Sequence, residues 1–153
     1  MTAVPKRRKW LRWLVLIFPA GVLAAGAVIW YIFTDTFSDT SKLKADFTVN
    51  ARDLIAEFRQ NDSAANRRYA EKLVQVRGVV TEVEKADTTV NIKMADTTSG
   101  SYIIFAFQQQ HLAEAKSIKE GDSVVIKGSC SGGAYSQILE AEFITFKRST
   151  LVK

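Results

Sequence analysis

The side chains that could carry out chemistry are few in this sequence and do not form a recognisable set. There is one cysteine, Cys130, and one histidine, His111, and no cluster of Cys, His or carboxylate residues has the spacing of a metal site. The sequence has no nucleophile elbow, phosphate-binding loop or zinc motif. Carboxylates two residues apart occur at Glu82 with Glu84 and at Glu140 with Glu142. Each pair falls on one face of a strand, where exposure to solvent explains it better than acid-base catalysis. We therefore expect a non-enzymatic protein without a metal or cofactor.

Basic residues are the second group that could bind a ligand. Four of them follow one another closely, at Arg67, Arg68, Lys72 and Arg77. Such a cluster can contact phosphate groups. Asp62 and Glu71 are interspersed, however, and a mixed pattern is typical of a solvated helix face. We favour the solvated face.

The distribution of charge argues against a nucleic-acid-binding domain. The formal net charge is +5 and the pI is about 9.4, values that by themselves suggest nucleic acid or an anionic surface. Five of the 21 Lys and Arg residues lie in the first twelve positions, where there is no acid. From residue 34 onward, 16 basic residues accompany all 16 acidic ones. The basicity therefore belongs to the N-terminal tail, and the remainder is formally neutral.

An uncharged run over residues 13–33 is expected to form a transmembrane helix. Its 21 residues suffice to cross a bilayer, which takes about 20. Trp13 at one end and Trp30 with Tyr31 at the other suit the two membrane interfaces. The alternative is a cleaved signal peptide, because Ala25-Gly26-Ala27 has the form of a cleavage site. The apolar run continues well past that site, which favours an uncleaved anchor.

The basic residues before this run set its expected orientation, since positive flanks stay in the cytoplasm. We predict four segments. Residues 1–12 form a basic cytoplasmic tail, residues 13–33 a single-pass anchor in the cytoplasmic (inner) membrane, residues 34–48 a polar linker, and residues 49–153 a domain on the periplasmic or extracellular side.

The periodicity of residues 49–153 predicts a mainly β domain with some helix. Leu54, Ile55 and Phe58 share one face of a helix over 51–60, and a second short helix follows it. From Leu73 the apolar period is two, and the alternation changes phase at Gly78, which predicts a β-bulge. Five strands are expected, with a helix over 109–118 after the third and a turn over 131–136 after the fourth: 73–83, 90–94, 102–107, 124–130 and 138–146. This order matches the five-stranded Greek-key OB barrel, here preceded by two short helices.

A set of motif residues lies within the range from roughly Val49 to Phe146: Asn61, Ala64-Ala65, Tyr69, Lys72, Val76, Gly78, Lys119-Glu120-Gly121-Asp122 and Lys127-Gly128-Ser129-Cys130-Ser131-Gly132. With these residues the sequence resembles the tRNA_anti-like group of OB-fold proteins, which are mostly bacterial envelope proteins. The resemblance implies the fold and does not imply an activity, because fold does not fix function.

Most of these motif residues have a structural interpretation. Asn61 suits a helix cap, and Tyr69 can pack its ring over the barrel end with its hydroxyl at the surface. Gly121 suits a turn and Gly128 a close approach of strands. Cys130 is in phase with apolar residues, so we expect a buried thiol, with pairing to another chain as the alternative.

Two functions remain open at the level of sequence. The first is a binding or assembly module that contacts an envelope protein or an oligosaccharide through its barrel face and loops. The second is single-stranded nucleic-acid binding through the same face, which the neutral charge disfavours. Candidate binding residues are Arg67, Arg68, Lys93 and Tyr102, with Phe105 and Phe107 near the same surface. The lead-in helices could either leave that face open or cover it.

Overall fold

The computed structural model describes residues 21–30 and 39–152. The chain divides into two compact units, Met1–Ser38 and Asp39–Lys153. In the first unit, residues 21–30 are helical and exposed. Among the described residues, no helix is both long enough and apolar enough to cross a membrane. The predicted tail, the predicted linker up to residue 38 and most of the predicted span (13–20 and 31–33) lie outside the described residues.

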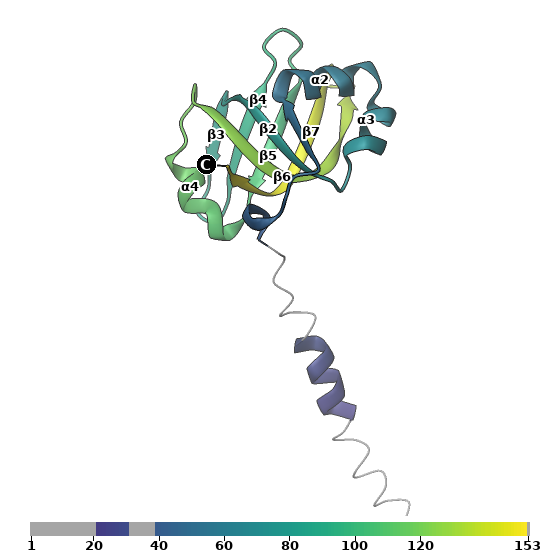
Figure 1. The fold of residues 1–153 in the computed structure, drawn as a ribbon, viewed down its shortest axis with the longest axis vertical. Helices are drawn as coiled ribbons and strands as arrows, with labels where there is room; N and C mark the ends of the chain where they lie inside the picture. Colours follow the sequence, from purple (N-terminus) through teal and green to yellow (C-terminus); the bar gives the residue numbers. More distant parts are fainter. Residues whose placement is uncertain (1–20, 31–38, 153) are drawn as a thin grey trace, which may run out of the picture. The chain divides into compact units, whose positions relative to one another are not determined.

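The second unit is built on a seven-stranded sheet within residues 39–152, in the order β1-β2-β6-β7-β5-β4-β3 (Figure 1). The strands are β1 Phe47–Asn50, β2 Leu73–Val79, β3 Glu82–Lys85, β4 Val90–Ala95, β5 Tyr102–Phe107, β6 Ser123–Ser136 and β7 Ala141–Leu151. β2 pairs antiparallel with β6, and β3 pairs antiparallel with β4. Because β2 and β3 are two halves of one run, this pairing closes the sheet into a barrel. β5 and β7 pair in parallel, as strands three and five of an OB barrel do.

The expectation of five strands is corrected at the start of the barrel. β1 lies where the linker and the start of the lead-in were expected, and it pairs in parallel with β2. The expected first strand is divided into β2 and β3. The register of β2 on β6 is regular through Gly78, which lies opposite Val124, so the predicted bulge at Gly78 is wrong. The phase changes instead at Val80–Thr81, where the strand leaves β6 for β4.

The β6–β7 hairpin also differs from the sequence prediction. The expected turn over 131–136 belongs to β6, and the connection is residues 137–140. β6 shows register irregularities on β7 between Lys127 and Ser129 and between Cys130 and Gly132. A Cβ on Gly133 would lie 2.6 Å from the Phe58 ring. Glycine is therefore required at position 133 by helix packing, and residues 131–136 continue the strand instead of forming a turn.

Helices close the two ends of the barrel. α2 (Ala51–Gln60) and α3 (Asp62–Tyr69) lie at one end, and α4 (Leu112–Ser117) lies at the other after the 3-10 turn η2 (Gln109–His111) (Figure 1). Both lead-in helices were predicted. The Asn61 side chain accepts a hydrogen bond from the backbone N–H of Ala64 at 2.9 Å, so its predicted capping role is confirmed. Leu54, Ile55 and Phe58 are at most 2% exposed and fill this end of the core.

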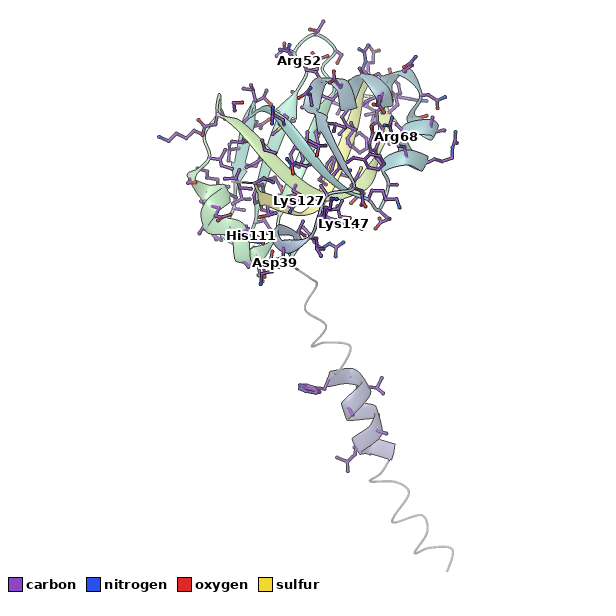
Figure 2. All side chains as sticks on the ribbon, in the orientation of Figure 1. Asp39, Arg52, Arg68, His111, Lys127 and Lys147 are labelled. Carbon is purple, nitrogen blue, oxygen red and sulfur yellow. The ribbon has the colours of Figure 1, made fainter. Side chains whose placement is uncertain are left out.

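The entry to the folded unit is fastened to the barrel. The 3-10 turn η1 (Thr40–Lys42) is followed by Leu43, and the Lys127 ammonium donates to the carbonyls of Ser41 at 2.9 Å and Leu43 at 2.7 Å. His111 Nε2 lies 2.8 Å from Asp39 Oδ1 (Figure 2). The hydrogen bonds from His111 and Ser41 hold the pKa of the Asp39 carboxyl well below its usual range. The folded unit therefore begins at Asp39, ten residues before the predicted boundary.

Gly78 provides a test of the packing between α2 and the barrel. A Cβ there would lie 2.6 Å from Met94 Sδ and 2.8 Å from Ala51 Cβ. Gly78→Ala should lower the free energy of unfolding by about 1–3 kcal/mol through overpacking. Urea unfolding followed by circular dichroism measures this. Adding Ala51→Gly should recover part of the loss, because the two positions share one contact; strictly additive effects would contradict the proposed clash.

Candidate binding face

The outer surface of β4 and β5 carries alternate side chains of each strand. On β4, Lys93 and Ala95 face outward, and on β5, Tyr102 and Ile104 do so. All four are half-buried. The register places Lys93 beside Ile104, and Tyr102 between Ala95 and Phe143 of β7. The sheet thus brings together residues that are far apart in the sequence.

Two aromatic rings and a cation form the centre of this face. The Tyr102 and Phe143 rings stack, with centroids 6.5 Å apart and an interplanar angle of 26°. The Lys93 ammonium lies 4.6 Å from the Tyr102 centroid. Glu82 of β3 pairs with Lys93 at 3.0 Å, and this bond raises the pKa of Lys93 above its usual value. The cation is therefore already partnered by a carboxylate.

A hollow of about 400 Å³ lies on this face, within the range of ligand sites. Its lining residues come from β3, β4, β5, the start of β7 and the connections between strands: Thr81, Glu82, Lys93, Ala95, Gly100, Tyr102, Leu139 and Ala141. None of them belongs to α2 or α3. The lead-in helices therefore leave the face open, which resolves the alternative left by the sequence.

The β6–β7 hairpin adds an exposed apolar tip beside this hollow. Ile138 is 93% exposed and Leu139 is 60% exposed, and Tyr135 near the end of β6 is 53% exposed. Leu139 also lines the hollow. Large apolar side chains that gather on a surface mark an interaction site more often than single exposed ones do.

The four candidate residues from the sequence divide between two places. Lys93 and Tyr102 meet on the open face. Arg68 lies on α3 (Figure 2), where it pairs with Glu57 at 3.2 Å and covers the rings of Phe47 and Tyr69. Arg67 is exposed on the same helix. Arg68 therefore stabilises the helix end of the barrel, Arg67 is exposed there, and neither arginine lies on the open face.

Sequence reasoning misplaced two aromatic residues and missed others. Phe105 and Phe107 point into the barrel and are buried, so their expected position near the binding surface is wrong. Phe105 packs on Phe146, with ring centroids 4.9 Å apart. The prediction of one continuous strand over residues 138–146 placed neither Phe143 nor the apolar tip on this face, whereas β7 begins at Ala141. The available signal was the alternation of Phe143 with Ile144, which places the two side chains on opposite faces of the strand.

The motif residues have mainly structural positions. Gly121 has a φ of +88°, and a Cβ on Gly128 would lie 2.7 Å from Ser149 Oγ, so one supports a turn and the other a close approach. Lys72 is exposed and its carbonyl accepts from the backbone N–H of Cys130 at 2.9 Å. Cys130 is fully buried, and burial raises the pKa of its thiol, so it packs as a small apolar residue.

Tyr69 differs from its expected position. The side chain is fully buried, and its hydroxyl donates to Glu57 Oε2 at 2.9 Å instead of reaching the surface. Burial and this hydrogen bond raise the pKa of Tyr69 to about 12. Its ring stacks on Phe58 with centroids 6.3 Å apart and meets Phe47 edge-on at 5.2 Å. Tyr69 thus ties α3 to α2 and β1.

Glu142 is buried, which corrects the expectation of an exposed carboxylate pair with Glu140. It is 5% exposed, and its Oε2 has no hydrogen-bond partner in the described part of the chain. Burial raises the pKa of Glu142, and Asp62 raises it further. Within the described ranges, no group of three His, Cys, Asp or Glu residues could hold a metal ion, so Glu142 has no such role there.

Glu142→Gln should stabilise the protein at neutral pH by on the order of 1 kcal/mol, because an ionised buried carboxylate is costly. A carboxyl whose folded pKa lies above its unfolded value loses stability as pH rises past the unfolded value. The gain should therefore shrink as pH falls below about 4. Thermal unfolding over a pH series measures it. Glu140→Gln, at the exposed neighbour, is the matched control and should have no such effect; equal gains from both would contradict the argument.

Comparisons with known proteins agree with this architecture. A lipoprotein of Klebsiella pneumoniae subsp. pneumoniae, to which nucleic-acid binding has been ascribed, is similar with a TM-score of 0.55 and 19% identity, over 69% of this chain and 91% of its own. An OBody bound to hen egg-white lysozyme gives 0.43 and 15%, over 56% and 86%. Asparaginyl-tRNA synthetase of Pyrococcus horikoshii gives 0.38 and 13%, over 56% of this chain and 21% of its own.

At such identities, the likeness to the lipoprotein concerns the fold alone, and the two lower scores add nothing to it. No curated protein matches the sequence. The family model described as tRNA_anti-like matches residues 1–141, most of the chain. Together with the barrel topology, this match establishes the family: the chain belongs to the tRNA_anti-like group of OB-fold proteins.

Proposed function

We propose that this protein is a non-catalytic binding or assembly module whose barrel contacts an envelope protein or an oligosaccharide. The observation that carries the proposal is the open face, where stacked Tyr102 and Phe143 rings adjoin a hollow of about 400 Å³. Aromatic rings supply large apolar contact area with few rotatable bonds, and both partner classes use them. The face needs no cofactor to bind in this way.

The charges of the face favour a ligand that is not a polyanion. Lys93 is paired with Glu82 of β3, and Glu84 is exposed on β3. A phosphate backbone requires an excess of unpaired cations. The projecting Ile138 and Leu139 favour a protein over an oligosaccharide, because aliphatic side chains gain most from an apolar pocket in the partner.

Single-stranded nucleic acid is the second candidate. The Lys93 ammonium above the Tyr102 ring, beside the Phe143 ring, is a geometry that can stack a base. The structurally similar lipoprotein also has nucleic-acid binding ascribed to it. Against this candidate stand the pairing of Lys93 and the neutral charge of the chain from residue 34 onward.

Photo-cross-linking in intact cells tests the first candidate. A photoreactive residue at Leu139 should give a discrete adduct, whereas one at Gln110, an exposed residue of η2 at the other end of the barrel, should not. Tyr102→Ala should reduce the Leu139 adduct severalfold, because it removes the ring that lines the hollow. Protease and glycosidase digestion of the adduct separates a protein from an oligosaccharide.

Two kinds of result would count against the first candidate. Equal adducts at the two positions, or none, would contradict the proposed face. The second candidate would replace the first if the purified protein bound an oligothymidylate tightly, with affinity that falls steeply with salt and is lost in Lys93→Ala.

We also propose that residues 13–33 hold the module in the cytoplasmic (inner) membrane, with residues 1–12 in the cytoplasm and the barrel outside. The support is the 21-residue uncharged run and the five basic residues before it. The protein should remain in the membrane pellet after alkaline carbonate extraction. Protease added to spheroplasts should digest the barrel. Release by carbonate, or protection of the barrel until lysis, would overturn this part of the proposal.

A further inference from the structure

A second hollow, of about 500 Å³, lies at the α2 end of the barrel, next to the open face. It is bounded by the first turn of α2, the end of β2 and the end of β4. Arg52 of α2 lies at this end of the molecule (Figure 2). The hollow borders the open face only at Thr81 and Ala95, which line both. Its volume lies within the range of small-molecule sites.

The floor of this hollow is apolar. Val79 is one of the few large apolar side chains of the folded unit that is more than half exposed, at 54%, and it lines the hollow. Ile55 and Met94 lie beside it with almost all of their surface already buried. Gly78 has no side chain, and Met94 therefore packs closely against its backbone. An aliphatic chain placed on this floor would cover the exposed side chain of Val79.

The carboxylates on the rim of the hollow already accept hydrogen bonds. Asp96 Oδ1 accepts from the backbone N–H of Thr98 at 3.2 Å, and its Oδ2 accepts from the Ser99 hydroxyl at 2.6 Å. Asp53 accepts from the Asn50 amide at 3.0 Å. The carboxylates of the rim are therefore engaged within their own turns.

The two arginines of the rim differ from these carboxylates. Arg52 and Arg77 both line the hollow, and neither makes an ion pair or a side-chain hydrogen bond with any residue that the structure describes. Arg68 of α3, by contrast, pairs with Glu57. A guanidinium offers five N–H donors in a planar fork that matches a carboxylate. The unmet chemistry of the rim is therefore that of a carboxylate acceptor.

We propose that this hollow binds a small aliphatic carboxylate, with its carboxylate on Arg52 and Arg77 and its chain over Val79 and Met94. Asp53 and Asp96 on the same rim limit the site to a single negative charge, because a more highly charged anion would be repelled by them. The site is distinct from the aromatic face and does not depend on the function proposed for it.

Titration of the full-length, ¹⁵N-labelled protein in a non-ionic detergent tests the site. Butyrate should shift the amide signals of Gly78 and Val79 in a saturable manner. Butylammonium should not, because it lacks the acceptor. Hexanoate should bind roughly tenfold more tightly than butyrate, as expected from two further buried methylene groups.

Arg52→Gln and Arg77→Gln should each weaken hexanoate binding by about tenfold, the loss expected for one charge-assisted hydrogen bond. Arg67→Gln is the matched control, since Arg67 is an exposed arginine on α3 that does not line the hollow. All three positions are exposed, so the variants should keep the spectrum of a folded protein. Unsaturable shifts, equal binding of butylammonium, or equal loss in Arg67→Gln would each overturn the proposal.

Discussion

The structure depends on one strand that serves two partners. β2 bonds to β6, β3 bonds to β4, and the change of partner takes place within Val80 and Thr81. Their backbone groups stay paired: the Val80 N–H donates to the Asp122 carbonyl at 2.9 Å, and the Thr81 N–H donates to the Lys93 carbonyl at 2.9 Å. The Thr81 hydroxyl also accepts from the Ala95 N–H at 3.0 Å. Without this change of partner the sheet would be left open, and Glu82 would not reach Lys93 on the candidate face.

Close packing at the α2 end supports that closure. α2 inserts its apolar side chains where Gly78 and Gly133 leave room, since a Cβ at either position would clash with Ala51 or Phe58. The outward side chains of β4, β5 and β7 are thereby carried on a filled core. The candidate face consequently has a fixed shape.

Local signals in the sequence predicted much of this fold, and the misses share a physical cause. The helical period of Leu54, Ile55 and Phe58 and the alternation in β4 depend on near neighbours, so they could be read correctly. The phase change near Gly78, the Gly132–Gly133 pair and the environment of Glu142 depend on partners far away in the chain. A period-two pattern shows that a strand changes face without showing which strand it pairs with. The meeting of Lys93 with Tyr102 was anticipated, whereas Phe143 required the parallel register of β5 on β7.

The fastening of residues 39–43 also decides where mechanical force enters the domain. A pull delivered through the preceding chain reaches Asp39 first, and it is borne by the contact with His111 and by the two hydrogen bonds of Lys127. These groups connect the entry to η2 and to β6, so the load passes into the closed barrel. β1 is a short strand paired with β2 alone, and it is shielded from tension until those polar contacts break. Lys127 and His111 therefore protect a four-residue strand at the end of the sheet order from tension.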